Sequence, residues 1–129
     1  MDAFEIQADV PGGPDAARRA RTFVRDVLAG RLPRRQLADV SLLVTELVAN
    51  GVRHGGAGSG RELQLRLQVR PAALRVEVAD PGPRRRVSPR RPDLAGGGGL
   101  GLQIVERVAS RWGVGDGPRT SVWFEMDCR

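Results

Sequence analysis

The sequence contains no lysine, so all 21 of its basic residues are arginine. A P-loop requires a lysine after its glycines, and Schiff-base catalysis requires a lysine amine, so both kinds of site are excluded. The formal net charge is +6 at pH 7. Basic charge alone supports only non-specific attraction to an acidic partner, so it does not identify a function.

Cysteine, aromatic residues and long apolar runs are also scarce. The single cysteine, Cys128, has no second cysteine with which to form an internal disulfide, which fits a reducing compartment. Aromatic residues make up 4% of the chain, too few for base-stacking platforms, so we expect no direct nucleic-acid binding. No apolar run approaches the roughly 20 residues of a membrane span. The acidic start MDAFEIQADV is unlike a signal peptide, and we expect a cytoplasmic protein with no membrane partner.

The stretch VTELVANGVRHG, residues 44–55, carries the first candidate site residues. Glu46 and Asn50 stand four residues apart, so on a helix they lie on one face. A carboxylate beside an amide suits a site where one group accepts a proton and the other holds a metal ion. The same pair also occurs as plain solvated helix surface. A neighbouring face is expected to pack on the core, because it holds Leu43, Val44, Leu47 and Val48.

Periodicity in the sequence predicts the architecture. The 129 residues suffice for one domain with a buried core, and neither a repeat nor a linker divides them, so we expect a single domain over residues 1–129. The order β-α-α-β-β-loop-α-β-β predicts an α+β fold. In this two-layer sandwich the helices cover one face of a mixed, largely antiparallel sheet. The expected strands are 4–10, 61–70, 73–80, 112–115 and 119–126, and the expected helices are 15–28, 34–54 and 100–110.

Asp80 is the second candidate site residue. It has the same parity as Val76 and Val78 along its strand, so its side chain is expected to point with theirs into the protein. A buried carboxylate is costly unless it has a partner, which suggests a ligand. The alternative is that Asp80 begins an Asx turn with Pro81 and Gly82.

A glycine run, residues 96–101, precedes the last expected helix. Glycines allow close approach of the backbone to phosphates, and a helix N-terminus offers free N–H groups. Gly96, Gly98 and Gly101 formally satisfy the dinucleotide-binding fingerprint. That fingerprint also needs a strand before it and an acidic residue about 20 positions later, and neither context is present. The remaining alternative is a flexible loop.

These three features occur in order: a helix with Glu46 and Asn50, an inward Asp80 with Gly82, and a glycine-rich stretch that opens a helix. Together they resemble the N, G1 and G2 boxes of the GHKL ATPases, the superfamily of gyrase, heat-shock chaperones, histidine kinases and mismatch-repair proteins. Within it, the segments ELVANGVRHG, VADPG, GGGLGLQIV and TSVWFEM resemble the small serine kinases that act as anti-sigma factors in actinobacteria. The resemblance extends over almost the whole chain.

The resemblance implies a role for each matching residue. Glu46 would act on the attacking hydroxyl or water, and Asn50 would coordinate Mg²⁺. Asp80 would accept a hydrogen bond from the adenine amino group, and Gly82 would let the backbone pass beneath the base. The residues that would wrap the phosphates of ATP are Gly97, Gly98, Gly99, Leu100 and Gly101.

Four further residues keep alternative roles. The hydroxyl residue that supports the adenine-binding aspartate in the family would be Thr120 or Ser121, and the resemblance does not choose between them. Arg53 and His54 fit either a ligand-binding role or capping of the last helical turn. His54 is the only histidine. Because His54 stands at a helix end and we expect no dimerisation helix before the domain, we do not expect a histidine-kinase role.

The sequence departs from the family in two places. The second glycine of the G1 box, two positions beyond Gly82, is replaced by Arg84. Residues 83–95, PRRRVSPRRPDLA, form a short proline- and arginine-rich segment that we expect to be a mobile loop or lid. Its arginines, which could touch phosphates or an acidic partner, are at positions 84, 85, 86, 90 and 91. Nucleotide binding is therefore a safer expectation than phosphate transfer.

The resemblance implies an ATP-dependent protein serine kinase with Mg²⁺ as its metal. Such a protein would sequester a sigma factor, phosphorylate a serine of a small antagonist protein, and form a homodimer. The alternative is a non-catalytic nucleotide-binding module of the same fold, which would act by regulated association alone. The role of Glu46 distinguishes the kinase from the non-catalytic module, because only the kinase needs a residue that acts on the attacking hydroxyl.

Overall fold

The computed structural model describes residues 3–54, 61–83, 86–87 and 100–128. The order of its elements is the order expected from the sequence, and α2 begins and ends at the residues predicted for it. The helices are α1 (Ala16–Leu28), α2 (Arg34–His54) and α3 (Leu100–Val108). The strands are β1 (Phe4–Pro11), β2 (Glu62–Val69), β3 (Ala73–Pro83), β4 (Arg111–Val114) and β5 (Arg119–Asp127).

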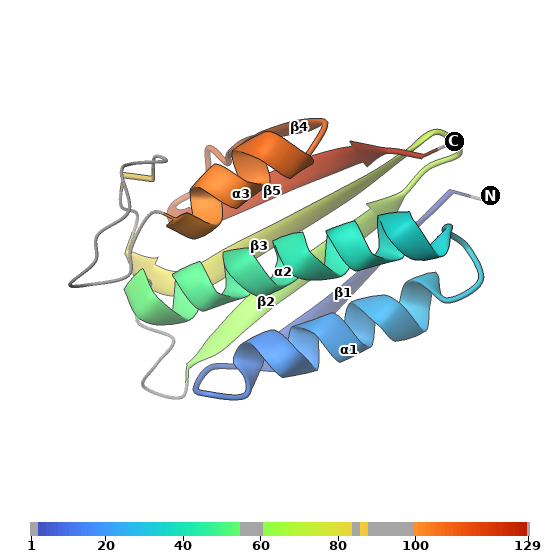
Figure 1. Ribbon diagram of the computed structural model, residues 1–129. Coiled ribbons are helices and arrows are strands. Elements are labelled where there is room, and N and C mark those ends of the chain that lie inside the picture. Colours follow the sequence, from blue (N-terminus) through green and yellow to red (C-terminus); the bar gives the residue numbers. More distant parts are fainter. Residues whose placement is uncertain (1–2, 55–60, 84–85, 88–99, 129) are drawn as a thin grey trace.

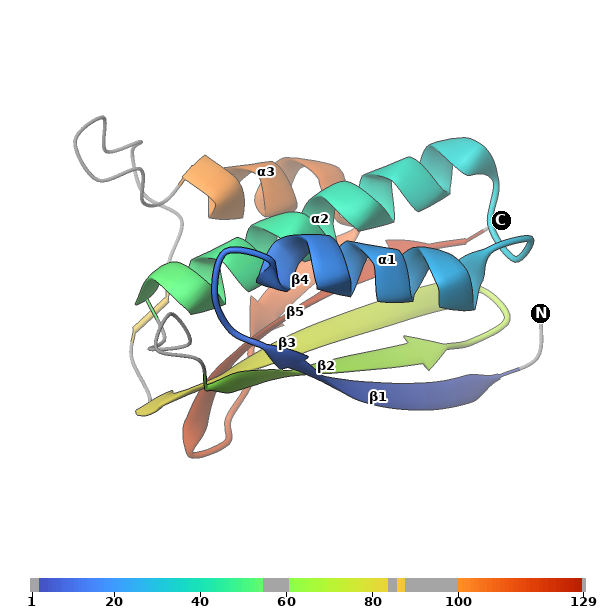
Figure 2. The same cartoon turned by 90° about the horizontal axis from the view of Figure 1, so that it is seen from below.

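The five strands form one sheet in the order β1-β2-β3-β5-β4. Figure 2 shows the helices on one face of this sheet and the other face open, which confirms the predicted two-layer α+β sandwich. The expectation of a mixed sheet was wrong for the described strands, since every neighbouring pair is antiparallel. The reason is that β4 takes the outer edge and turns back, so that β5 enters beside β3 in the opposite direction.

The core lies between the helices and the inner face of the sheet. Figure 1 shows α2 across the middle of the sheet, with α1 on one side and α3 on the other. Because α2 is the central helix, its predicted apolar face is completely covered: Leu43, Val44, Leu47 and Val48 are at most 2% exposed. None of the described helices is both long and apolar enough to span a membrane.

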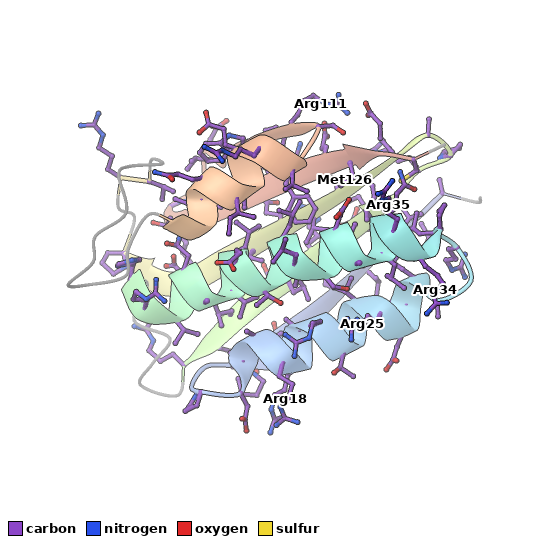
Figure 3. All side chains as sticks on the ribbon, in the orientation of Figure 1. Arg18, Arg25, Arg34, Arg35, Arg111 and Met126 are labelled. Carbon is purple, nitrogen blue, oxygen red and sulfur yellow. The ribbon has the colours of Figure 1, made fainter. Side chains whose placement is uncertain are left out.

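Charged side chains cover the outside of both layers. Figure 3 shows Arg18 and Arg25 on α1 and Arg34 and Arg35 at the start of α2, all of them exposed. The open face of the sheet carries ion pairs between neighbouring strands, such as Arg66 Nε to Glu5 Oε1 at 2.6 Å. Hydrogen bonds from the Arg66 guanidinium hold the pKa of the Glu5 carboxyl below its usual value.

Candidate functional site

The last turns of α2 lie beside the C-terminal half of β3, where both elements carry predicted site residues (Figure 1). Gly51 lies where the two elements meet. A β-carbon added to it would lie 3.6 Å from the Cβ of Asp80. Gly51 follows Asn50 directly, and Glu46 lies one turn before Asn50 on the same helix. The structure therefore brings the Glu46–Asn50 face and Asp80 to the same end of the molecule.

The Asp80 side chain is buried and held by a turn. It is 3% exposed, which confirms the inward orientation predicted from its parity. Its Oδ1 accepts a hydrogen bond from the backbone N–H of Gly82 at 3.2 Å, so the Asx turn considered as the alternative is also present. The Asx turn is compatible with a ligand-binding role of Asp80, because the turn engages Oδ1 of the carboxylate and thereby sets the direction of Oδ2.

A β-bulge places Asp80 outside the regular ladder. Ala79 pairs with Ser121 and Pro83 pairs with Arg119, so an advance of four residues along β3 corresponds to an advance of only two residues along β5. A bulge releases backbone groups from inter-strand pairing and re-aims side chains. Here it leaves the Gly82 N–H available to the Asp80 carboxylate. The expected strand ended at Asp80, with a turn through Pro81 and Gly82 as the alternative role of this residue, and the structure shows that β3 continues to Pro83.

Arg61 ties this bulge to the start of β2. Its Nη2 donates a hydrogen bond to the carbonyl oxygen of Pro81 at 2.8 Å. Its own carbonyl oxygen accepts a hydrogen bond from the Gly12 N–H at 3.0 Å. Sequence reasoning missed Arg61, because nothing in the local pattern distinguishes it among 21 arginines. The bond exists only because β2 and β3 are neighbours in the sheet.

The two candidate hydroxyls of β5 lie on opposite faces of the sheet. Thr120 is 1% exposed and has the parity of Val122 and Phe124, so it lies on the helix-covered face that also carries Asp80. Ser121 lies on the open face, where its Oγ donates to Glu77 Oε2 at 3.0 Å. The parity argument that predicted the orientation of Asp80 could have separated these two residues. A role in supporting Asp80 stays a prediction, and the geometry favours Thr120 for it.

Glu46 and Asn50 are both half-buried on α2, so each combines a fixed position with partial access to solvent. Among the described residues, no group of three or more His, Cys, Asp and Glu side chains could hold a metal ion. Magnesium keeps several waters and takes oxygen ligands from phosphates, so it needs few protein ligands. The Asn50 amide oxygen is of the type it prefers, and Asn50 stays the predicted magnesium ligand.

Part of the predicted phosphate site falls outside the described residues, namely Gly97, Gly98 and Gly99. Leu100 and Gly101 are described and form the first two residues of α3. The first backbone N–H groups of a helix have no partner within the helix itself, and such a helix start suits an anion. Arg53 and His54 occupy the exposed last turn of α2, so a capping role and a ligand-binding role both stay open. Arg84, Arg85, Arg90 and Arg91 also lie outside the described residues, and Arg86 is exposed.

The described donors and acceptors fit an adenine nucleotide with its metal. Asp80 can supply a buried acceptor for an exocyclic amino group, and Gly82 beside it has no side chain. Asn50 supplies an amide oxygen on the adjacent helix, and α3 supplies a helix N-terminus. A base, a metal ion and a phosphate chain are thus each matched by one element of the structure.

Comparison with known families agrees with this geometry. The family model for the histidine kinase-like ATPase domain matches residues 10–126, which is nearly the whole chain. The match includes all the predicted site residues, from Glu46 to Ser121. No curated protein matches the chain.

Proposed function

The chain belongs to the histidine kinase-like ATPase family, and from this premise we propose that it is an ATP-dependent protein serine kinase of the anti-sigma type. The observation that carries the proposal is the buried Asp80 beside the turn of α2 that holds Asn50. It supports a site that selects one base and holds the phosphates at a fixed distance from it. The family supplies ATP binding, and the finer role rests on the four sequence motifs.

Asp80 gives the site its base selectivity. The adenine amino group is a donor, so it can hydrogen-bond to Oδ2 while Oδ1 stays engaged by the Gly82 N–H. Guanine carries a carbonyl oxygen at the corresponding position, and two acceptors facing each other in a buried site repel. A hydrogen bond to a charged group contributes about 1.5–3 kcal/mol. We therefore expect ATP to bind at least tenfold more tightly than GTP.

Glu46 and Asn50 supply the chemistry of transfer. Asn50 would hold Mg²⁺ through its amide oxygen, and the ion would supply charge neutralisation at the phosphoryl group. Glu46 accepts the proton of the serine hydroxyl as that oxygen attacks the γ-phosphorus. The γ-phosphorus–oxygen bond to the leaving ADP then breaks. Positioning and electrostatics supply most of the rate in such reactions, which suits a site built from so few groups.

The partners in this proposal are a sigma factor and a small antagonist protein that carries the acceptor serine, with the kinase acting as a cytoplasmic homodimer. The support is the likeness of the four motifs to the anti-sigma branch. The alternative is a nucleotide-binding module that transfers nothing. It is favoured by one observation, the arginine at position 84 where the family has its second G1 glycine.

Calorimetry with ATP, ADP and GTP, each with and without Mg²⁺, tests the proposed binding. We expect ATP and ADP to bind and GTP to bind at least tenfold more weakly. Incubation with radiolabelled ATP and a serine-containing antagonist protein tests transfer. Equal affinity for ATP and GTP would remove the role of Asp80. ATP binding without transfer to any antagonist would favour the module.

Removing the Arg61 side chain is expected to loosen the base site without unfolding the domain. In Arg61→Ala the Pro81 carbonyl loses its charged donor, so the bulge samples more conformations and ATP affinity falls about fivefold. Because Arg61 is exposed, the loss is kept small by water that replaces the guanidinium. Calorimetry with ATP measures this loss of affinity. Arg70→Ala is the matched control, because Arg70 is an exposed arginine at the other end of β2. An unchanged affinity in Arg61→Ala would show that the bulge needs no such support.

A further inference from the structure

Gly51 lies inside α2, three residues before its last residue, His54, although glycine is among the least favourable residues for a helix interior. The structure shows what its lack of a side chain permits. A β-carbon at this position would lie 2.5 Å from Cδ2 of Leu63, well inside van der Waals contact, and 3.6 Å from Cβ of Asp80. Leu63 is fully buried in β2, so its methyl group has packed neighbours and cannot simply swing into solvent.

Gly51 differs from the other buried residues of α2 in having no side chain. Most of those residues are Val and Leu, whose side chains fill the space between the helix and the sheet. At Gly51 the backbone itself packs against β2 and β3. This is the residue next to Asn50, and the strand residue it meets is Asp80. The contact at Gly51 therefore lies between the residue next to the predicted metal ligand and the predicted base acceptor.

We propose that Gly51 is a positioning residue that sets the spacing between Asn50 on α2 and Asp80 on β3, and thereby the fit of a nucleotide that spans them. This inference rests on the proposed function, because the spacing matters only if one ligand is held at both residues. A methyl group at position 51 moves α2 away from the strands or displaces Leu63 toward Asp80. Either displacement changes the distance between Asn50 and Asp80. In enzymes a misplacement of about 1 Å can cost on the order of a hundredfold in rate.

The chain offers a compensating change. Leu63→Val removes the Cδ2 atom that a β-carbon at position 51 would meet. In the double variant, Gly51→Ala adds one methylene to α2 and Leu63→Val removes one from β2, so the total side-chain volume at the interface is nearly unchanged. Four variants make the test: Gly51→Ala, Leu63→Val, the double variant, and Gly117→Ala as a control. Gly117 has open space where a β-carbon would stand and lies in the turn between β4 and β5.

Calorimetry with ATP, ADP and GTP on each variant gives the first readout. We expect Gly51→Ala to bind ATP about tenfold more weakly and to lose part of its preference over GTP. Leu63→Val and Gly117→Ala should bind ATP within about threefold of wild type, and the double variant should recover most of the affinity. A purely structural role of Gly51 would lower stability without changing the ratio of ATP to GTP affinity.

Urea unfolding of the ligand-free proteins gives a second readout. Alanine favours helix over glycine, so in the absence of the contact Gly51→Ala raises the unfolding midpoint. We expect it instead to lower the midpoint, and Leu63→Val to reverse that change in the double variant. The inference would be overturned if wild type and Gly51→Ala bound ATP equally well and with the same preference over GTP. The proposed function would still stand in that case. Wild type that binds no ATP would overturn both.

Discussion

Asp80→Asn is expected to reverse the base preference, so that GTP binds more tightly than ATP. The backbone N–H of Gly82 donates to Oδ1, and an amide nitrogen cannot accept that bond, so the asparagine carbonyl oxygen takes the place of Oδ1. The amide nitrogen then occupies the place of Oδ2 and becomes a donor. It opposes the adenine amino group and matches the guanine carbonyl. Losing the charged acceptor should weaken ATP binding about 10- to 100-fold.

The measurement is calorimetry with both nucleotides on wild type and Asp80→Asn. Asp116→Asn is the matched control, because Asp116 is an exposed aspartate in the turn between β4 and β5 and should leave both affinities unchanged. Since the Asx-turn bond survives in asparagine, the fold should be retained, and circular dichroism checks it. A variant that stays folded and still prefers ATP as wild type does would show that Asp80 is not the base-selecting residue.

Glu46→Gln is expected to remove phosphate transfer while leaving ATP affinity within about twofold of wild type. Glutamine has nearly the same shape as glutamate but cannot take up the proton of the attacking hydroxyl. General base catalysis contributes about 10²- to 10⁴-fold, and the rate of serine phosphorylation should fall by that factor. Nucleotide affinity should be preserved because Asn50 and Asp80, which contact the metal and the base in our proposal, are unchanged.

Single-turnover transfer from radiolabelled ATP to the antagonist serine measures this effect, and calorimetry measures the affinity. Glu106→Gln is the control, because Glu106 is an exposed glutamate on α3 and should transfer at the wild-type rate. Equal loss of binding and transfer in Glu46→Gln would indicate a binding role for Glu46. Undiminished transfer would mean that another residue accepts the proton.

Several features of the site could be predicted from periodicity. The buried stripe of α2 follows from apolar residues three and four apart, and the inward Asp80 follows from parity with Val76 and Val78. Both depend on residues within one element, so the rest of the chain is not needed to derive them. The same rule applied to Val122 and Phe124 would also have placed Thr120, rather than Ser121, on the face with Asp80.

Other features could not be derived in this way. The β-bulge between Ala79 and Pro83 depends on the register of β3 against β5, and the DPG sequence is equally compatible with a plain turn. The antiparallel arrangement of the whole sheet depends on where β4 joins it. The bond from Arg61 to Pro81 depends on the pairing of β2 with β3. Each of these involves segments whose relative position no local pattern encodes.

By itself the sequence determined the layers, the bounds of α2 and the inward orientation of Asp80, because side-chain periodicity is a property of single elements. Only the tertiary structure decided that α2 packs against Leu63 and Asp80 at Gly51. The room for this contact depends on the size of Leu63, a residue 12 positions from Gly51 that no pattern connects to the site. Packing between the layers depends on short-range contacts between individual atoms, so these contacts are defined only when the helices and the sheet are in place.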